Sequence, residues 1–331
     1  MNARELVGKW EIFLFAVLII VLAIGTLISE YFLTTSNISI ALAGAMPTAI
    51  VSLAMMAVIV TGEIDISVGS TVGLCAAAIG ITIEQGGSAE LAVLSSIVAG
   101  FAAGALNGVV VAYGRVPSLV ATLGTLALFR GIAQIVLEER GVSNFPEWYQ
   151  QLGFGTVPFT PFPWSAVPFV LLFLIALFIL HGTYWGRGLF ALGNNRTAAD
   201  YSGIETRRYI FAAFVAAGLA CSIAAIVLTS YLASARSDTA IGLELNVITA
   251  VVLGGVSVFG GSGKLIGVVI AVFVLALVQN VLGLASVTPE RQQVVIGLVL
   301  IVSLITFAGP AKLRAWMARH TARTNAQTVS N

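Results

Sequence analysis

Hydroxyl and amide side chains inside apolar runs are the groups in this sequence that could handle a small molecule. Ser118, Thr122 and Thr125 are spaced i, i+4 and i+7, which places them on one face of a helix. Asn107 adds an amide in the preceding run, and Arg130 lies farther along, where its side chain could reach the outer surface. This pattern predicts a path for a neutral, hydroxylated solute. The alternative is that the hydroxyls only hold helices together.

Two carboxylates stand at the edge of an apolar run, in the segment 61–70. Ionisable residues within a bilayer are costly, and they are functional candidates by default. We expect Glu63 to reach water at the lipid headgroups. For Asp65, which has an isoleucine on each side, a functional role and a headgroup position stay equally open. Asp65 and Ser67 join the candidate path.

The sequence offers no grouping typical of catalysis or metal binding. Cys75 and Cys221 lie singly in apolar runs, and His181 and His320 each flank such a run alone. The stretch 260–264 ends in Gly-Lys, but it lacks the earlier glycine and the following Ser or Thr of a phosphate loop. We therefore expect no catalytic residue, no metal site, and no ATP site in this chain.

Composition identifies the elements that must position these residues. Of 331 residues, 58% are hydrophobic and 9% are charged, with a net charge of +1 and a mean hydropathy of +1.01. A soluble domain carries roughly 45–50% apolar and about 25% charged residues. A soluble enzyme or a nucleic-acid-binding protein is excluded. We predict an all-α, polytopic membrane bundle that forms one domain over 1–311, with a short basic tail at 312–331.

About ten apolar runs have the length of a transmembrane helix, about 20 residues. They cover 12–29, 38–60, 64–83, 91–113, 116–137, 165–182, 210–232, 240–259, 264–284 and 293–309. The eighth contains Gly254 and Gly255, so we expect a broken helix near 245–260. Gly100, Gly104 and Gly108 recur every four residues, which predicts close helix packing.

The basic residues predict the orientation. With ten spans and a cytoplasmic N-terminus, twelve Lys and Arg fall inside and three fall outside, while Arg130 lies within a span. The outer residues are Arg140, Arg236 and Arg291. The inner residues are Arg4, Lys9, Arg115, Arg187, Arg196, Arg207, Arg208, Lys264, Lys312, Arg314, Arg319 and Arg323. Both termini are therefore expected in the cytoplasm, as is the loop 183–209.

That inner loop carries a second candidate site. Asn194 or Asn195 suits a helix N-cap, 196–201 suits a short helix, and Gly203 suits the position after its end. The small face of Ala198 and Ala199 could insert into a groove of another protein. An interfacial helix would need a wide apolar face, which is missing, so we favour docking. The candidate residues are Gly193, Asn194, Asn195, Arg196, Ala198, Ala199, Asp200, Ser202 and Gly203.

Four motifs carry a resemblance to the permease subunits of bacterial ABC importers of the ribose, xylose and galactoside class. They are 62–69, 122–125 with 130–131, the loop 191–204, and 248–255 followed by 260–263. The resemblance covers nearly the whole chain. It implies a permease of the bacterial inner membrane rather than an enzyme. It further implies a separate cytoplasmic ATPase that binds ATP and Mg, a periplasmic or lipid-anchored sugar-binding protein, and a second permease subunit, identical or different. The loop 183–209 would contain the coupling helix.

One departure from the pattern concerns the solute. Glu63 stands where many ribose-type members have Gly, and 63–67 with 234–238 looks closer to the rhamnose and autoinducer-2 branches. We expect a monosaccharide or sugar-like solute of the rhamnose, autoinducer-2 or pentose class. The alternative is a self-sufficient secondary transporter or channel for small polyols, which would need ionisable groups at mid-membrane.

Overall fold

The computed structural model of the chain describes residues 3–138 and 140–305. The predicted tail 312–331, His320 and the end of the last predicted span lie outside these residues. The described secondary structure is helical except for two isolated β-bridges, which confirms the all-α prediction. The helices are α1 (Ala3–Ile28), α2 (Thr35–Val60), α3 (Val68–Glu84), α4 (Ala89–Gly108), α5 (Ser118–Leu137), α6 (Glu147–Phe154), α7 (Ala166–Leu177), α8 (Tyr184–Asn194), α9 (Arg196–Tyr201), α10 (Thr206–Leu232), α11 (Leu243–Leu253) and α12 (Leu265–Leu284).

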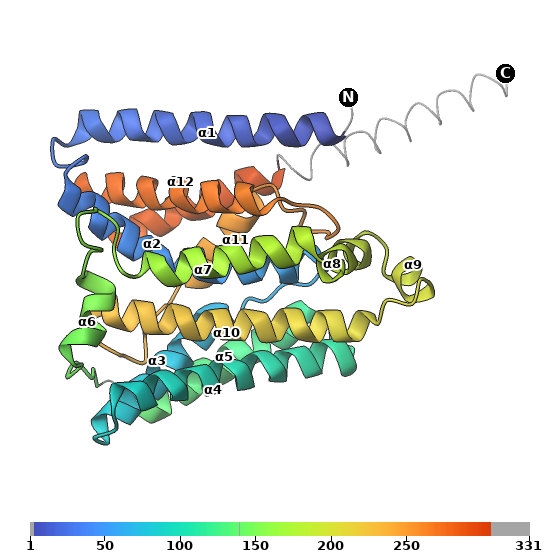
Figure 1. Cartoon of the computed structure of the whole chain (residues 1–331), viewed down its shortest axis with the longest axis horizontal. Coiled ribbons are helices and arrows are strands. Elements are labelled where there is room, and N and C mark those ends of the chain that lie inside the picture. Colours follow the sequence, from blue (N-terminus) through green and yellow to red (C-terminus); the bar gives the residue numbers. More distant parts are fainter. Residues whose placement is uncertain (1–2, 139, 306–331) are drawn as a thin grey trace.

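Two short π-helical turns extend this set, and a last helix follows it. The turns Val109–Tyr113 and Phe178–Gly182 continue α4 and α7 without a break. The last helix occupies 289–305. The long helices lie side by side, with α1 at one edge of the bundle and α4 at the other (Figure 1).

Six of the described helices are long and apolar enough to cross a membrane. They are Trp10–Ile28, Thr35–Val60, Ala89–Tyr113, Ser118–Leu137, Thr206–Leu232 and Leu265–Leu284. Ala166–Gly182 and α8 together make a seventh candidate, bent by 68° between its two parts. The chain is thus a polytopic helical membrane protein.

The three remaining predicted spans contain shorter helices. Val68–Glu84 has 17 residues and Leu243–Leu253 has 11, while 289–305 runs to the end of the described residues. α11 ends at Leu253, and Gly254 caps it; Gly255 follows with a φ of 88°, a conformation that favours glycine. The predicted break near 245–260 is therefore present, because the glycine pair stops the helix.

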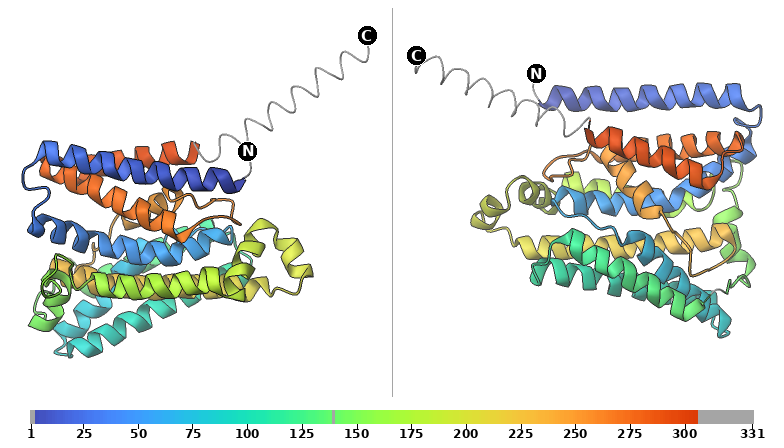
Figure 2. Two further views of the ribbon diagram at one scale, coloured as in Figure 1. Left: turned by 45° about the horizontal axis from the view of Figure 1, so that its top comes forward. Right: turned by 180° about the vertical axis from the view of Figure 1, so that it is seen from behind.

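Close glycine packing holds α10 against α4, which lies at the edge of the bundle opposite α1. A Cβ atom on Gly218 would collide with the carbonyl oxygen of Gly100, and one on Gly104 would meet the backbone of Phe214. The glycine face predicted on 100–108 therefore allows the close contact expected of it. α10 also packs on α2, α3 and α6, which makes it the central helix (Figure 2).

The two ends of the bundle carry different short helices. α6 caps one end, where Tyr149 is fully buried and its hydroxyl lies 2.7 Å from Oγ1 of Thr229 on α10. α8 and α9 project at the other end, where α1 begins (Figure 1). The loop 183–209 therefore lies at the same end of the bundle as the beginning of α1.

Candidate functional site

A non-helical connection, 61–67 (the extended segment), separates α2 from α3 and meets the predicted hydroxyl stripe of α5. The Ile64 amide donates to Ser118 Oγ over 3.1 Å, and the Ile66 amide donates to Thr122 Oγ1 over 3.3 Å. Thr122 in turn donates to the Ser118 carbonyl over 2.7 Å. The stripe therefore exists on one helix face, and two of its hydroxyls bind the backbone of the extended segment.

Asp65 lies inside the protein and organises the start of α3. Its side chain is 3% exposed, and its Oδ1 accepts from the Ser67 amide over 2.8 Å and from Ser67 Oγ over 2.6 Å. Asn107 Nδ2 donates to Ser67 Oγ over 2.8 Å, while Asn107 Oδ1 is buried without a hydrogen-bond partner. The structure thus brings Asp65, Ser67 and Asn107 into one buried network.

Thr125 and Arg130 lie farther along α5. Thr125 is buried, and its hydroxyl makes a long bond of 3.4 Å to the Thr122 carbonyl. Arg130 does not extend freely to the outside, because its guanidinium donates to the carbonyls of Ser237 and Thr239, both over 2.9 Å. It therefore fastens the loop 233–242 to α5.

The predicted short helix is confirmed at 196–201. Asn195 is its N-cap, with Oδ1 accepting from the Ala198 amide over 3.0 Å, and Gly203 follows its end with a φ of 81°. Ala199, however, is 4% exposed and packs inside this chain. The predicted small face is therefore divided, because Ala198 is exposed whereas Ala199 turns inward. Tyr201 is 90% exposed.

Three contacts tie α9 and its flanks to the rest of the bundle. Arg196 forms an ion pair with Glu63 at 3.2 Å, which joins α9 to the extended segment. The Asp200 carboxylate accepts from the Thr206 hydroxyl, over 2.8 Å, at the start of α10. Movement of α9 would thus pull on two separate parts of the bundle.

The glycine-rich loop 260–263 provides the third contact. Asn194 Nδ2 donates to the Gly261 carbonyl over 3.0 Å, and the Gly261 amide donates to the Val60 carbonyl over 2.9 Å. Gly193 has no room for a side chain, because a Cβ atom would collide with that Val60 carbonyl. The end of α2, the end of α8 and this loop therefore meet backbone to backbone.

A polar pocket of about 930 Å³ opens beside α9. Its charged lining residues are Glu63, Arg115, Arg196, Asp200, Glu205, Arg207 and Arg208. Four arginines predicted to share the inner side of the membrane therefore do lie together. Among the described residues, no group of three His, Cys, Asp or Glu side chains could hold a metal ion.

Sequence reasoning missed two features of this region. Glu63 was expected to face water, yet it is only 14% exposed and pairs with Arg196 from far along the chain. The stretch 260–264 was rejected as a phosphate loop and otherwise noted only as part of a family motif, whereas its glycines let it lie against Val60 and Asn194. The positive φ angles of Gly260 and Gly261 show why glycine is needed there.

Comparison with known proteins gives one family and a consistent set of relatives. Residues 37–304 match the family described as branched-chain amino acid transport system / permease component. The chain is similar to the autoinducer 2 import system permease protein LsrD of Escherichia coli strain SMS-3-5 / SECEC, with 35% identity over 321 residues. This alignment covers 94% of the chain and 96% of the relative. The proteins of that name from Escherichia coli K12 and Shigella flexneri match to the same identity and coverage. No solved structure matches.

The Arg196–Glu63 pair predicts a charge-swap result. Glu63→Lys or Arg196→Glu alone should speed hydrogen exchange of the α9 amides by up to about fivefold, since a partly exposed pair contributes about 0.2–1 kcal/mol. The double swap should restore slow exchange, and high salt should weaken the effect. Arg207→Glu in the same pocket is the matched control. Equal exchange in both single variants and the wild type would show that the pair does not hold α9.

Proposed function

The chain belongs to this permease family, and from that premise we propose that it moves a sugar-like solute inward, powered by a separate ATPase. As a permease it is a transport component and not an enzyme. The observation that carries the ATPase proposal is the placement of α9. This helix is exposed at one end of the bundle yet bonded to the extended segment and to α10, and Asn194, at the end of α8 just before it, is bonded to the glycine loop. A push from a partner on α9 would reach all three.

We propose a complex with four kinds of participant around this chain. They are a cytoplasmic ABC ATPase that binds ATP and Mg²⁺, a periplasmic or lipid-anchored sugar-binding protein, a second permease subunit, and the lipid of the bacterial inner membrane. The relatives are named as permeases of autoinducer 2 import. Their similarity over 94% of the chain favours autoinducer 2 or a similar sugar-like solute over ribose.

The proposed solute path combines buried polar residues around the extended segment with the half-buried Arg130 farther along α5. They are Asp65, Ser67, Asn107, Ser118, Thr122, Thr125 and Arg130. Their hydroxyl and amide groups suit a neutral solute with several hydroxyls. Thr125 supports the path best, because its hydroxyl makes only the long bond to the Thr122 carbonyl and is available for a stronger partner.

Thr125 gives the test of the path. Thr125→Val keeps the shape and removes the hydroxyl, so uptake of autoinducer 2 by the assembled complex should fall about two- to tenfold, as expected for one hydrogen bond. Thr125→Ser should retain uptake. Thr26→Val on α1 is the matched control, because that hydroxyl bonds only its own helix. Normal uptake by Thr125→Val would place the path elsewhere.

We propose ten membrane crossings with both termini in the cytoplasm. The basis is the twelve-to-three distribution of Lys and Arg, together with a helix in each of the ten predicted runs. Reporter fusions after Asn195 should read as cytoplasmic, and fusions after Ser237 should read as external. Reversal of either reading would refute this topology.

The coupling proposal predicts the effect of a bulky residue on α9. Ala198→Trp adds a large side chain on the exposed face, so it should block docking of the ATPase and abolish both uptake and solute-stimulated ATP hydrolysis. Its membrane abundance should equal that of the wild type, because Ala198 does not pack inside the chain. Ala198→Ser is the control.

Ala199 cannot serve for this test. It is buried, so a larger residue there would disturb the fold itself. Normal transport by Ala198→Trp, with the ATPase still bound, would show that α9 is only a connector.

A further inference from the structure

The loop 233–242 enters the bundle along a glycine face of α3. Three of its residues lie so close to glycines of that helix that a Cβ atom there would be 3.0 or 3.1 Å from them. The pairs are Ala235 with Gly80, Thr239 with Gly73, and Ala240 with Gly69. These glycines follow one another toward the start of α3. The loop therefore runs along this helix before it leads into α11.

The loop ends far from the surface of the bundle. α3 ends at Glu84 beside α6, since Ile83 and Trp148 line the same hollow. Gly69 precedes Glu84 by fifteen residues, which is about 22 Å along the helix at 1.5 Å per residue. The hydrocarbon core of a bilayer is about 30 Å thick. The start of α11 therefore lies inside the membrane-spanning part of the bundle.

The second residue of α11 is a carboxylate, Glu244, which lies against α3. A Cβ atom on Gly69 would collide with its Oε2 atom, so this glycine leaves the space that the carboxylate occupies. Glu244 is partly exposed. Within the described part of the chain no hydrogen bond or ion pair involves its carboxylate, although the charge of Arg130 acts on it. Its acceptor oxygens are therefore open to a ligand.

Arg130 of α5 places a positive charge on the same glycine face. Its Nη1 atom lies where a Cβ atom on Gly73 would be only 2.8 Å away, and its Nη2 atom donates to the Gly69 carbonyl over 3.5 Å. Its two further bonds, to carbonyls of the loop, hold the loop at this depth. The guanidinium and the Glu244 carboxylate thus lie one helical turn apart, and each lowers the cost of burying the other.

The depth of Glu244 restricts what its exposed part can face. An ionised carboxylate is costly against acyl chains, and such residues face the bundle interior or a polar cavity. A neutral solute with several hydroxyl groups brings hydrogen-bond donors. Hydrogen bonds to an ionised acceptor are about twice as strong as those between neutral groups. The unpaired carboxylate therefore suits such a solute.

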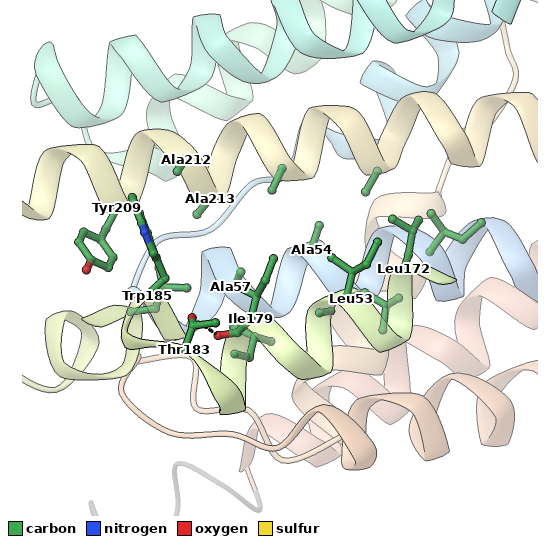
Figure 3. Close-up of a pocket in the computed structure, with 17 residues that line it drawn as sticks. Leu53, Ala54, Ala57, Leu172, Ile179, Thr183, Trp185, Tyr209, Ala212 and Ala213 are labelled. Atoms are coloured by element: carbon green, nitrogen blue, oxygen red, sulfur yellow. Dashed lines mark hydrogen bonds between the residues drawn. The ribbon is translucent and has the colours of Figure 1, made fainter. Parts of the chain in front are cut away.

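The apolar groove between α2, α7 and α10 does not offer such groups. Its volume is about 460 Å³, and its lining is aliphatic except for Thr183, Trp185 and Tyr209 toward one end (Figure 3). The Thr183 hydroxyl already donates to the Ile179 carbonyl over 2.7 Å. A hydroxylated solute would lose hydrogen bonds to water there without replacing them, which is costly. Glu244 is the better place for it.

We propose that Glu244 is a solute-binding residue, whose carboxylate accepts hydrogen bonds from hydroxyl groups of the transported solute beside Arg130. This inference rests on the function proposed above. It adds to the path an acceptor that, unlike Asp65, is not occupied by a hydroxyl of the protein itself. Gly69 is a positioning residue, because it leaves the room that the carboxylate needs.

Uptake by the assembled complex, with its binding protein saturated with autoinducer 2, tests this assignment. Glu244→Gln keeps the shape and removes the charge, so the uptake rate should fall about tenfold, as expected when hydrogen bonds to a charged group are weakened. Glu290→Gln is the matched control and should keep the wild-type rate. Glu290 is an exposed carboxylate that is likewise the second residue of its helix, 289–305. Membrane abundance and basal ATP hydrolysis should be unchanged in both.

Analogues of the solute give a readout that a structural role would not change. Among analogues of autoinducer 2 that each lack one hydroxyl, the wild type should transport at least one about tenfold more slowly than the parent. Glu244→Gln should transport that analogue and the parent at similar rates, because the hydroxyl has lost its acceptor. Glu290→Gln should discriminate as the wild type does.

Several results would overturn the assignment. The wild-type rate in Glu244→Gln, or unchanged discrimination between the parent and the analogues, would remove Glu244 from the path. Loss of subunit pairing in Glu244→Gln would assign the carboxylate to a protein interface. Uptake that needs a proton or sodium gradient in the wild type but not in Glu244→Gln would assign it to a cation. Absence of uptake in the wild type would refute the proposed function itself, and this assignment with it.

Labelling of the wild type covers the case that Glu244→Gln does not assemble. A water-soluble carbodiimide with an added amine modifies accessible carboxylates, and mass spectrometry locates the product. Glu244 should be modified severalfold more slowly during turnover with solute-loaded binding protein than with empty binding protein. Glu290 should be modified equally in both. Modification of Glu244 that is equal, or absent, under both conditions would refute the site.

Discussion

Backbone polar groups outside helices must find partners within the protein, because a bilayer offers no water to replace them. This chain places two such segments, 61–67 and 254–264, among its apolar helices. Ser118 and Thr122 accept from the first segment, and the Val60 carbonyl accepts from Gly261 of the second. These bonds allow the bundle to contain broken helices at all. Loss of such a partner leaves a buried donor unsatisfied, at a cost of about 1–3 kcal/mol.

The same bonds make a continuous connection through the protein. α9 pairs with the extended segment through Arg196 and Glu63, and that segment is bound to α5 through Ser118 and Thr122. Asp65 and Ser67 then fix the start of α3. A partner that pressed on α9 would therefore act on α3 and α5 together. A helix of only six residues at one end of the bundle is therefore linked by side-chain contacts to the longer helices within it.

Local sequence patterns predicted much of this arrangement. The rest depends on contacts between residues far apart in the chain, which local patterns do not reveal. The helix at 196–201 followed from an Asn cap and a terminal glycine, which depend on neighbours in sequence. The hydroxyl stripe of α5 followed from helical spacing. Spacing shows which residues share a helix face, but it does not show that this face contacts the backbone of 61–67. Glu63 was expected to reach headgroup water because it stands in a loop at the edge of an apolar run. Its partner, Arg196, lies 133 positions away.

α1 has its packing partners at the far end of the chain, which has a consequence for how the protein is made. It packs on α12, and the Trp10 indole donates to the Leu253 carbonyl, 243 residues later. At about 5–20 residues per second, roughly 12 to 50 s of synthesis separate the two. During that time α1 lies in the bilayer without its final neighbours. The apolar stretch from Trp10 to Ile28 is long enough to span the bilayer by itself, so α1 can remain in the membrane until its partners are made.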